Sequence, residues 1–539
     1  MNDGLKDQQR NAILEVLNKH PKIERAVLFG SRAMGTFTPT SDIDIALYGD
    51  LTLRDQARIA DEIEQLSIPY TVDLVRMKTV KSPELIEHIR VHGKPWTSGE
   101  RRGERRVTTF QLLLDEGLLE IGDGYRAQNN ELGGTGPIFL RAGHVTDSHI
   151  DFAGVEHFHE HLAAKVRSKM AKVGDTIITT KGNSTGRTSF VTDLFPPFVY
   201  SPHLSYWRTR DAGKLCGGFL RYWSQGVEFV DQLSAMKTST DMAPYLSLTD
   251  QRRLSITLPP LAEQIAIAAV LGSLDDKIEL NRRMNATLEA MARALFQSWF
   301  VDFDPVRAKL DGRPPAGLDT ATGALFPVTF QESTLGPIPH GWEVCPLFDK
   351  IQILSGGTPK TSEPTYWEGD IPWYSVRDAP SETDVWVIHT DKHVTKLGIS
   401  NSAAQVFPEK TTIISARGTV GKLALTAVPM AMNQSCYGVR GSTGYGDYFT
   451  YYSLREATAQ LLQRTHGTVF DTITTETFKT LDCIFPTPEI TVAFEKLVEP
   501  LLGQIRANLH QSRTLATLRD TLLPKLLSGM ISTTDFQSI

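Results

Sequence analysis

Three aspartates near the start of the chain are spaced for phosphate chemistry. Asp42 and Asp44 alternate with Ile43 and Ile45 in the run DIDIAL, and Asp73 lies in the later apolar run TVDLV. Residues i and i+2 of a strand point to the same side, so Asp42 and Asp44 share a face, which Asp73 joins if the strands are neighbours. Clustered carboxylates repel one another unless cations neutralise them, and hard oxygen ligands suit Mg²⁺. Two such ions would hold the attacking and leaving oxygens of an in-line displacement at phosphorus.

A Gly-Ser pair supplies the other half of such a site. Gly30 and Ser31 follow an apolar strand predicted at residues 25–29 and open a short helix. Backbone N–H groups there, together with the Ser31 hydroxyl, can hold a triphosphate, and glycine leaves room for it. One helix is predicted at about residues 5–17. Another, over residues 82–93, begins with Ser-Pro and ends at glycine.

These residues resemble the polymerase-β-like minimal nucleotidyltransferases, whose pattern is Gly-Ser, a spacer, Asp-x-Asp and a later third Asp. The resemblance spans residues 1–97 and implies transfer of a nucleoside monophosphate from an NTP, with release of pyrophosphate. It implies that Asp42, Asp44 and Asp73 are catalytic and hold Mg²⁺, that Asp73 accepts the proton of the acceptor hydroxyl, and that Gly30 and Ser31 bind the nucleotide. The small size resembles the antitoxin type that modifies a toxin protein. A protein or an RNA acceptor stays open, as does an inactive fold used for docking.

The rest of the chain contains an internal repeat. TLEAMARALF from Thr287 matches TLATLRDTLL from Thr514 at an offset of 227 residues, and GDTIITTKGNSTGR from Gly174 is similar to KTTIISARGTVGK from Lys410. β-Branched runs broken by glycine and proline predict strands upstream in each copy. A continuous run of helix formers after residue 260 predicts a long helix. Each copy is therefore predicted to be a β-rich module followed by a long helix.

Both long helices carry residues at the 4-3 spacing of a coiled-coil seam. The seams are Leu274, Ile278, Asn281, Asn285, Leu288, Ala292, Leu295 and Trp299, and Leu501, Ile505, Asn508, Ser512, Leu515, Arg519, Leu522 and Leu526. They are predicted to cover each other in an antiparallel coiled coil in which Asn281 pairs with Asn508 and penalises slipped registers. Pro500 and Pro524 predict interruptions of the second helix.

The repeat resembles the specificity subunits of type I restriction-modification systems. The segment from Ser255 to Phe303, beginning SITLPPLAEQ, resembles the first spacer of that family, and GGTPKTSEPTYW from Gly356 and ISARGTVGKLAL from Ile414 resemble its target recognition domains. The resemblance covers about residues 107–539. It implies a non-catalytic subunit that binds double-stranded DNA, two methyltransferase subunits and the restriction translocase subunit. S-adenosylmethionine would be used only by the partner methyltransferase.

Candidate DNA contacts lie in loops of the two β-rich modules. The residues that flank glycines after predicted strands are Lys181 and Arg187 in the first module and Arg417 and Lys422 in the second. Glycine permits close approach to a phosphate backbone, although solvated turn residues are an equal alternative for each of these side chains. Asn433 and Gln434 are candidates for contacts with adenine.

Length and composition favour several soluble domains. The chain has 539 residues, of which 41% are hydrophobic and 22% charged, and its net charge is −6, so DNA contact requires local groups of Lys and Arg. No apolar run is long enough for a membrane helix and the start does not resemble a signal peptide, so we expect a cytoplasmic protein without a membrane partner.

The predicted fold class is a multidomain α+β protein with a small α/β nucleotidyltransferase domain. The predicted parts are that domain (1–97), a linker (98–106), the first target recognition domain (107–258), the first spacer helix (259–310), a loop (311–341), the second recognition domain (342–485) and the second spacer helix (486–539). Two other functions stay open. The chain could be primarily a nucleotidyltransferase directed to DNA by the repeat, or a scaffold without either activity.

Overall fold

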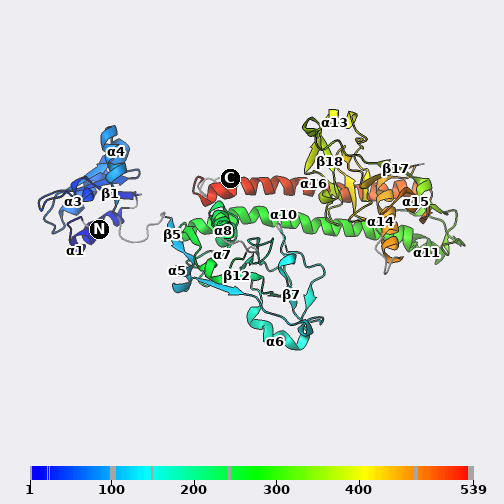
Figure 1. Cartoon of the computed structure of the whole chain (residues 1–539), viewed down its shortest axis with the longest axis horizontal. Helices are drawn as coiled ribbons and strands as arrows, with labels where there is room; N and C mark the ends of the chain where they lie inside the picture. Colours follow the sequence, from blue (N-terminus) through cyan, green and yellow to red (C-terminus); the bar gives the residue numbers. More distant parts are fainter. Residues whose placement is uncertain are drawn as a thin grey trace. The chain divides into compact units, whose positions relative to one another are not determined.

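The computed structural model describes residues 3–20, 22–23, 25–96, 105–146, 150–238, 245–442, 444–464 and 472–531 (Figure 1). The chain divides into two compact units, one of residues 1–119 and 249–264 and the other of residues 120–248 and 265–539. None of the helices in the described ranges is long and apolar enough to cross a membrane.

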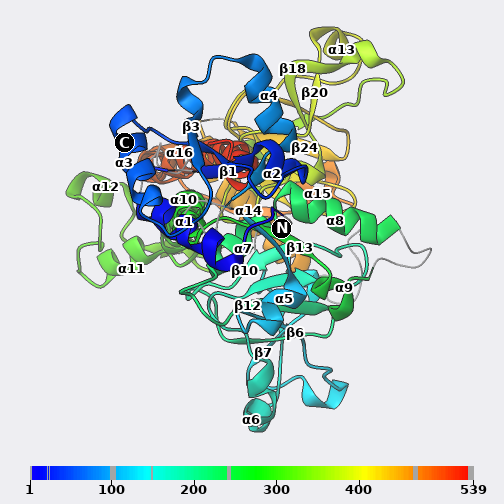
Figure 2. The same ribbon diagram turned by 90° about the vertical axis from the view of Figure 1, so that its left-hand side faces the viewer.

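A four-stranded sheet forms the centre of the N-terminal domain (Figure 2). Its order is β3 (Val72–Arg76), β2 (Ile43–Tyr48), β1 (Arg25–Phe29) and β4 (Lys94–Pro95). β2 and β3 are parallel, and the other neighbours are antiparallel. The helices are α1 (Asp7–Lys19), α2 (Gly30–Met34), α3 (Leu53–Glu64) and α4 (Pro83–His92). The predicted strand at 25–29 is confirmed.

The two faces of this sheet pack against different helices. Ile45 and Leu74 belong to an apolar cluster with residues of α1 and α3. Ala46 belongs to a second cluster with residues of α4. Because side chains alternate along a strand, Asp44 and Asp73 lie on the face that α4 covers.

The predicted linker is shorter than expected at its C-terminal end. β5 (Arg106–Thr109) already begins at Arg106 and pairs antiparallel with β13 (Ser255–Leu258), next to α5 (Phe110–Asp115). Arg105 forms an ion pair with Glu263 at 2.6 Å. Residues 97–104 lie outside the described part of the chain.

The two β-rich modules share one topology. In the first β module (residues 119–248), β6 (Leu119–Asp123), β12 (Leu204–Thr209), β9 (Thr176–Thr179) and β10 (Thr188–Phe190) form one sheet, and β8 (Glu156–His157), β7 (Ile138–Leu140) and β11 (Phe198–Tyr200) form another. In the second β module (residues 343–485), the corresponding strands are β17 (Ile351–Ser355), β24 (Cys436–Gly441), β21 (Thr412–Ser415) and β22 (Leu423–Thr426), then β20 (Lys392–Val394), β18 (Trp367–Tyr374) and β23 (Ala431–Met432). The β7–β11 and β18–β23 pairs are both parallel. The second module adds β19 (Trp386–Val387) beside β22.

Both modules contain helices that the sequence pattern did not indicate. They are α6 (Ala163–Val166), α7 (Gly217–Trp223), α8 (Val227–Thr238) and α9 (Leu248–Arg252) in or just after the first, and α13 (Lys396–Ser400), α14 (Asp447–Arg464) and α15 (Thr475–Lys479) in the second. α14 is rich in aromatic residues, which favour strands in isolation, but Tyr451, Tyr452 and Leu454 are all buried in the core of the module. The strands β16 (Glu343–Pro346) and β25 (Asp482–Phe485) pair antiparallel at the two ends of the second module.

The two long helices α10 (Leu261–Phe296) and α16 (Pro488–Leu527) lie side by side (Figure 1). None of the predicted seam residues is exposed. The contacts, in order along α10, are Asp275 with Arg519, Asn285 with Asn508 and Phe296 with Phe494. Positions on α16 fall as positions on α10 rise, so the predicted antiparallel pairing is confirmed.

The buried asparagines pair in part as predicted, because the amide of Asn281 donates to the main-chain oxygen of Asn508 (3.4 Å), but their side chains bond to other residues. The amide of Asn281 donates to Gln511 Oε1 (2.9 Å) and Ser512 Oγ (3.1 Å), and the amide of Asn508 donates to Asn285 Oδ1 (2.9 Å). Ser512 is the repeat counterpart of Asn285, as Asn508 is of Asn281. The bond from Asn281 to Ser512 and the bond from Asn508 to Asn285 are therefore related by the repeat. Only a residue at the midpoint of an antiparallel pair faces its own counterpart, and that midpoint lies between residues 281 and 285.

The second long helix is continuous, and the predicted interruptions at Pro500 and Pro524 are wrong. Each proline removes one main-chain donor, but the buried residues Val498, Leu502 and Leu526 keep the helix packed on both sides of these positions. The predicted loop 311–341 is also more ordered than expected. It contains α12 (Thr320–Leu325), β14 (Phe330–Gln331) and β15 (Ile338–Pro339), after α11 (Asp304–Leu310).

Candidate functional site

The strand register of the N-terminal domain brings two of the three predicted aspartates together. In the parallel pair of β2 and β3, Asp44 lies directly beside Asp73. Asp42 precedes β2 by one residue and is exposed, as is Asp73, whereas Asp44 is half-buried. The arrangement is an open acidic group at the end of two neighbouring strands, where a phosphate-bearing ligand can approach.

Gly30 lies against this acidic group. It has a φ of 69°, and a Cβ at this position would lie 2.2 Å from Asp44 Oδ2. Any other residue would therefore displace the carboxylate as well as strain the backbone. Ser31 follows as the second residue of α2 and is half-buried.

Burial and neighbouring charges raise the pKa of Asp44. Burial is the largest cause, followed by the carboxylates of Asp73 and then Asp42, while Arg32 and His88 act in the opposite direction. The negative charge is therefore costly without a counter-ion, which is the condition that favours a divalent cation.

The donor set fits Mg²⁺ only in part. Among the described residues, no three His, Cys, Asp or Glu side chains converge into a complete metal site. Mg²⁺ usually keeps waters and uses one or two carboxylates together with substrate phosphates, so an incomplete carboxylate set is compatible with it. The predicted roles of Asp42, Asp44, Asp73, Gly30 and Ser31 stay predictions.

Arg32 holds the segment that leads into the acidic group, a role that no motif in the sequence predicted. The side chain is 1% exposed and has main-chain acceptors: Nε donates to Ser41 O and Asp42 O (both 3.0 Å), and Nη1 donates to Asp3 O (2.9 Å). Its guanidinium also lies 4.3 Å from the centre of the Tyr70 ring. Its position directly after Gly-Ser was the only signal available from the sequence.

In each β module, the glycine loop and a tight turn meet at one edge, which we call the turn edge. Thr180 N donates to His203 O in the first module, and Ala416 N donates to Ser435 O in the second. The turn edge thus comprises residues 180–187 and 201–203 in the first module, and 416–422 and 433–435 in the second. In the second module, the structure therefore brings the loop of Arg417 and Lys422 to the turn that contains Asn433 and Gln434.

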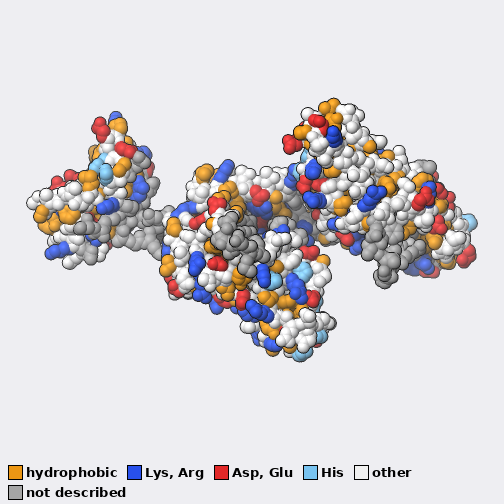
Figure 3. Space-filling view, in the orientation of Figure 1, with side chains coloured by type: hydrophobic (Ala, Val, Ile, Leu, Met, Phe, Trp, Pro, Cys, Tyr) orange, Lys and Arg blue, Asp and Glu red, His pale blue; other side chains and the backbone are white. Residues whose placement is uncertain are grey.

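The predicted DNA contacts differ in how exposed their side chains are and in the hydrogen bonds that Asn433 and Gln434 make. Lys181, Arg187, Arg417 and Lys422 are all exposed. Asn433 is half-buried and its Oδ1 accepts from Ser435 N at 3.1 Å, so one of its two recognition atoms is already engaged. Gln434 is exposed, and its Oε1 accepts from the Thr358 hydroxyl. On the face drawn in Figure 3, Lys and Arg are interspersed with Asp and Glu.

Close main-chain contacts establish which residues of the two turn edges correspond. A Cβ on Gly124 would lie 2.0 Å from Ser201 O, and a Cβ on Gly356 would lie 2.1 Å from Asn433 O. Gly356 lies 232 residues after Gly124, and Asn433 lies 232 residues after Ser201. This offset differs from that of the long helices because loop lengths differ between the copies. The turn residues Asn433, Gln434 and Ser435 therefore correspond to Ser201, Pro202 and His203.

Comparison with known proteins identifies the family. The family model for the type I restriction modification DNA specificity domain matches residues 128–290 and 339–505, more than half of the chain. This chain belongs to the type I DNA specificity family. The family model for polymerase beta, nucleotidyltransferase matches residues 11–100, so this family member carries a nucleotidyltransferase domain at its N-terminus.

Individual relatives cover different parts of this type I specificity protein. The type I restriction enzyme HindI specificity subunit of Haemophilus influenzae is 28% identical over 349 residues, 57% of this chain and 75% of that protein. A solved S subunit of a type I restriction-modification system from M. genitalium is 15% identical, with a TM-score of 0.47, over 80% of this chain and 97% of that one. A solved toxin-antitoxin structure with AMP-PNP is 30% identical, with a TM-score of 0.15, over 16% of this chain and 73% of that one.

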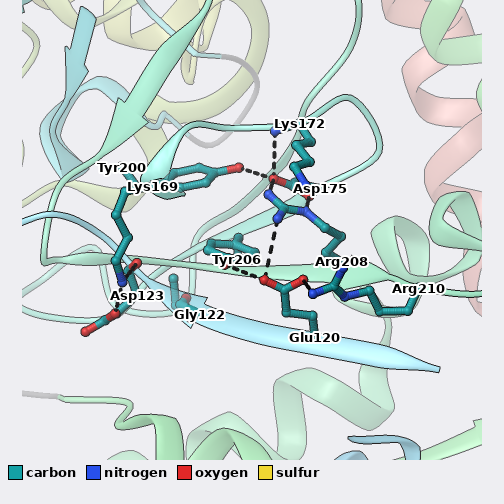
Figure 4. Close-up of polar contacts among 11 residues, drawn as sticks. Glu120, Gly122, Asp123, Lys169, Lys172, Asp175, Tyr200, Tyr206, Arg208 and Arg210 are labelled. Atoms are coloured by element: carbon teal, nitrogen blue, oxygen red, sulfur yellow. Dashed lines mark hydrogen bonds and ion pairs between the residues drawn. The ribbon is translucent and has the colours of Figure 1, made fainter. Parts of the chain in front are cut away.

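A buried polar group stabilises the first β module of this specificity protein (Figure 4). Asp175 is fully buried and accepts from Arg208 Nε (2.6 Å) and Nη2 (2.7 Å), and from the hydroxyl of Tyr200 (2.7 Å). Burial, then the Asp175 carboxylate, raises the pKa of Tyr200, so its hydroxyl stays a donor. The group joins the start of β9 to β11 and β12, the strands that position the turn edge.

Proposed function

We propose that each β module contacts one half of a bipartite DNA sequence and that the pair of α10 and α16 sets the gap between the halves. The observation that carries this proposal is the repeated topology of the two modules, which flank a helix pair with repeat-related contacts. The modules contact the helix pair at different positions. Arg221 of the first forms an ion pair with Asp275, and Arg455 of the second forms one with Glu289.

The proposed partners are those of a type I system. Two methyltransferase subunits and the restriction translocase subunit would assemble on this chain, and S-adenosylmethionine would be bound by the methyltransferase. A role in double-stranded DNA recognition agrees with the exposed Lys and Arg residues at both turn edges.

Methylation sequencing of DNA from cells that contain this chain and its cognate methyltransferase tests the DNA function. We expect one methylated motif with two defined halves and an undefined gap. An Asp42→Asn/Asp44→Asn chain should give the same motif, because these residues lie in the N-terminal domain. Absence of a bipartite motif with the wild-type chain would contradict the proposal.

For the N-terminal domain, we propose transfer of a nucleoside monophosphate from an NTP to a hydroxyl of a protein or RNA. The acceptor oxygen attacks the α-phosphorus in line. The bond between the α-phosphorus and the oxygen that bridges it to the β-phosphorus breaks, and pyrophosphate leaves. Asp73 accepts the proton of the acceptor hydroxyl, while Gly30 and Ser31 bind the triphosphate. Mg²⁺ held by Asp42, Asp44 and Asp73 would neutralise the phosphate charge. The juxtaposition of Asp44, Asp73 and Gly30 supports this activity.

Transfer of label from an α-³²P-labelled NTP to co-purifying protein or RNA tests this second activity. Labelling should require a divalent cation and should be lost in the Asp42→Asn/Asp44→Asn chain. No labelling with any of the four nucleotides and either Mg²⁺ or Mn²⁺ would favour an inactive fold used for docking.

A further inference from the structure

A cavity opens beside the turn edge of the first β module. It has a volume of about 420 Å³, and the residues that line it include Arg126, Phe139, Arg141, Ser201 and His203. Arg126 and His203 are exposed, and neither side chain has a hydrogen bond or ion pair within the described ranges. The Ser201 hydroxyl is buried and also lacks a hydrogen-bond partner there.

Arg141 lines this cavity and is held by contacts that leave it exposed. Its guanidinium lies 5.0 Å from the centre of the Phe139 ring, and it forms an ion pair with Glu156. Both partners of that pair are about half exposed, at 50% and 46%, so the ion pair is weak and can exchange for another anion.

The corresponding place in the second β module lacks these two arginines, although the exposed Arg377 stands there in place of the lining residue Gly143. Arg141 and Ser375 occupy the same position, because the main-chain N–H of each donates to the side chain three residues later, His144 or Asp378, at the start of a short helical turn. Gly124 and Gly356 likewise align Arg126 with Thr358. The second module therefore has Thr358, Ser375, Asn433 and Ser435 where the first has Arg126, Arg141, Ser201 and His203.

We propose that the cavity of the first β module binds a backbone phosphate of DNA through Arg126 and Arg141, with His203 and the Ser201 hydroxyl as further donors. The inference rests on the proposed DNA function and adds that the two modules divide it unequally. Two guanidinium groups and an unpaired hydroxyl around an open cavity match the oxygens of a phosphate. The first module thus holds the phosphate through Arg126 and Arg141, whereas the second carries the uncharged residues Thr358 and Ser375 at these two positions.

Binding of the full-length chain to fluorescent duplex DNA of random sequence, over a series of salt concentrations, tests this inference. For Arg126→Gln/Arg141→Gln we expect affinity to fall about tenfold and the slope of log affinity against log salt to decrease by about 1, the contribution of one phosphate. Arg126→Thr/Arg141→Ser, which installs the residues that the second module carries, should behave in the same way. Glu156→Gln should bind about twofold to threefold more tightly, because it removes a competing carboxylate.

Arg210→Gln is the matched control. Arg210 is an exposed arginine of the same module, at the opposite end of β12 from His203. The DNA affinity and the salt slope of the Arg210→Gln chain should stay within about twofold of those of the wild type. Arg126→Lys/Arg141→Lys keeps both charges and should retain most of the affinity.

Three results would overturn the inference and leave the proposed DNA function intact. One is unchanged affinity and salt slope in the folded double variants, and another is a loss of the same size in Arg210→Gln. A loss confined to DNA that carries the methylated motif would mean that these arginines contact bases instead of phosphate. A wild-type chain that shows no salt-dependent DNA binding would contradict the proposed DNA function itself, and the inference with it.

Discussion

At the scale of single residues, we expect the buried ion pair of Asp175 and Arg208 to stabilise the first β module. Asp175→Ala would leave the Arg208 guanidinium, 11% exposed, without its buried partner. We expect the module to lose about 3–5 kcal/mol of its free energy of unfolding. Hydrogen exchange measured on peptides from β9 and β12 would report this loss.

The control for this prediction is Asp123→Ala, in the same module (Figure 4). Its partner Lys169 is 34% exposed and Asp123 itself is 55% exposed, so the change should cost less than about 1 kcal/mol. Equal losses in the free energy of unfolding for the two substitutions would show that burial of the Asp175 pair does not increase its contribution to stability.

Asp44 is a residue whose proposed role conflicts with stability. Burial and the neighbouring carboxylates disfavour its charge, so Asp44→Asn should stabilise the N-terminal domain at neutral pH by about 0.5–1 kcal/mol, after allowance for solvent screening. Mg²⁺ should slow hydrogen exchange of β2 in the wild-type chain and have no such effect in the variant. Faster exchange in the variant without metal would contradict the expectation.

At the scale of elements, the repeat-related asparagine bonds stabilise the antiparallel register of α10 and α16. Asn508→Ala leaves Asn285 Oδ1 and Gln504 Nε2 without their partner and should cost about 1–3 kcal/mol, as should Asn281→Ala. In a double-mutant cycle, Asn285→Ala and Asn508→Ala should show a coupling of about 0.5–1.5 kcal/mol. Chemical unfolding followed by helix circular dichroism would measure the losses of the single variants and the coupling energy. If the losses of Asn285→Ala and Asn508→Ala simply add in the double variant, the two side chains are not directly bonded.

The contact of α14 with α16 is expected to depend on pH. Burial raises the pKa of Glu495 on α16 to about 7, although its Oε1 accepts from Phe449 N of α14 at 2.7 Å. Because this pKa is higher in the folded than in the unfolded chain, the carboxyl is more stable protonated, and stability falls as pH rises through about 7. From pH about 6 to about 8, we expect a loss of about 1 kcal/mol.

Glu495→Gln keeps the acceptor oxygen and removes the titration. The variant should be more stable than wild type at about pH 8, and the part of the pH dependence that comes from this residue should disappear. Thermal unfolding of both proteins across this pH range is the measurement. Parallel curves for the two proteins would mean that Glu495 is not the titrating group.

At the scale of the whole molecule, the N-terminal domain has a core of its own. Its two apolar clusters consist of residues between 5 and 96, with Trp96 among them. We therefore expect both fragments to stay folded after cleavage at a protease site placed within residues 98–104. Circular dichroism and hydrogen exchange of the two purified fragments would check this, and unfolding of either fragment would show that the parts depend on each other.

Local patterns in the sequence determined the strand at residues 25–29, the two long helices and the presence of two similar β modules. Alternation in DIDIAL predicted which side chains share a face, and the 4-3 spacing predicted a seam along each long helix, because each is a property of neighbouring residues. The repeat likewise predicted two β modules of one type, and their shared strand order confirms it.

Only the tertiary structure decided which residues meet across long stretches of chain. The parallel register placed Asp73 beside Asp44, the midpoint of the helix pair set Asn281 against Ser512, and contacts at Gly124 and Gly356 aligned the two turn edges. The physical reason is that packing of the buried faces sets registers and loop paths, and such packing involves residues far apart in sequence. For the same reason α16 continues through its prolines, where local preference alone predicted interruptions.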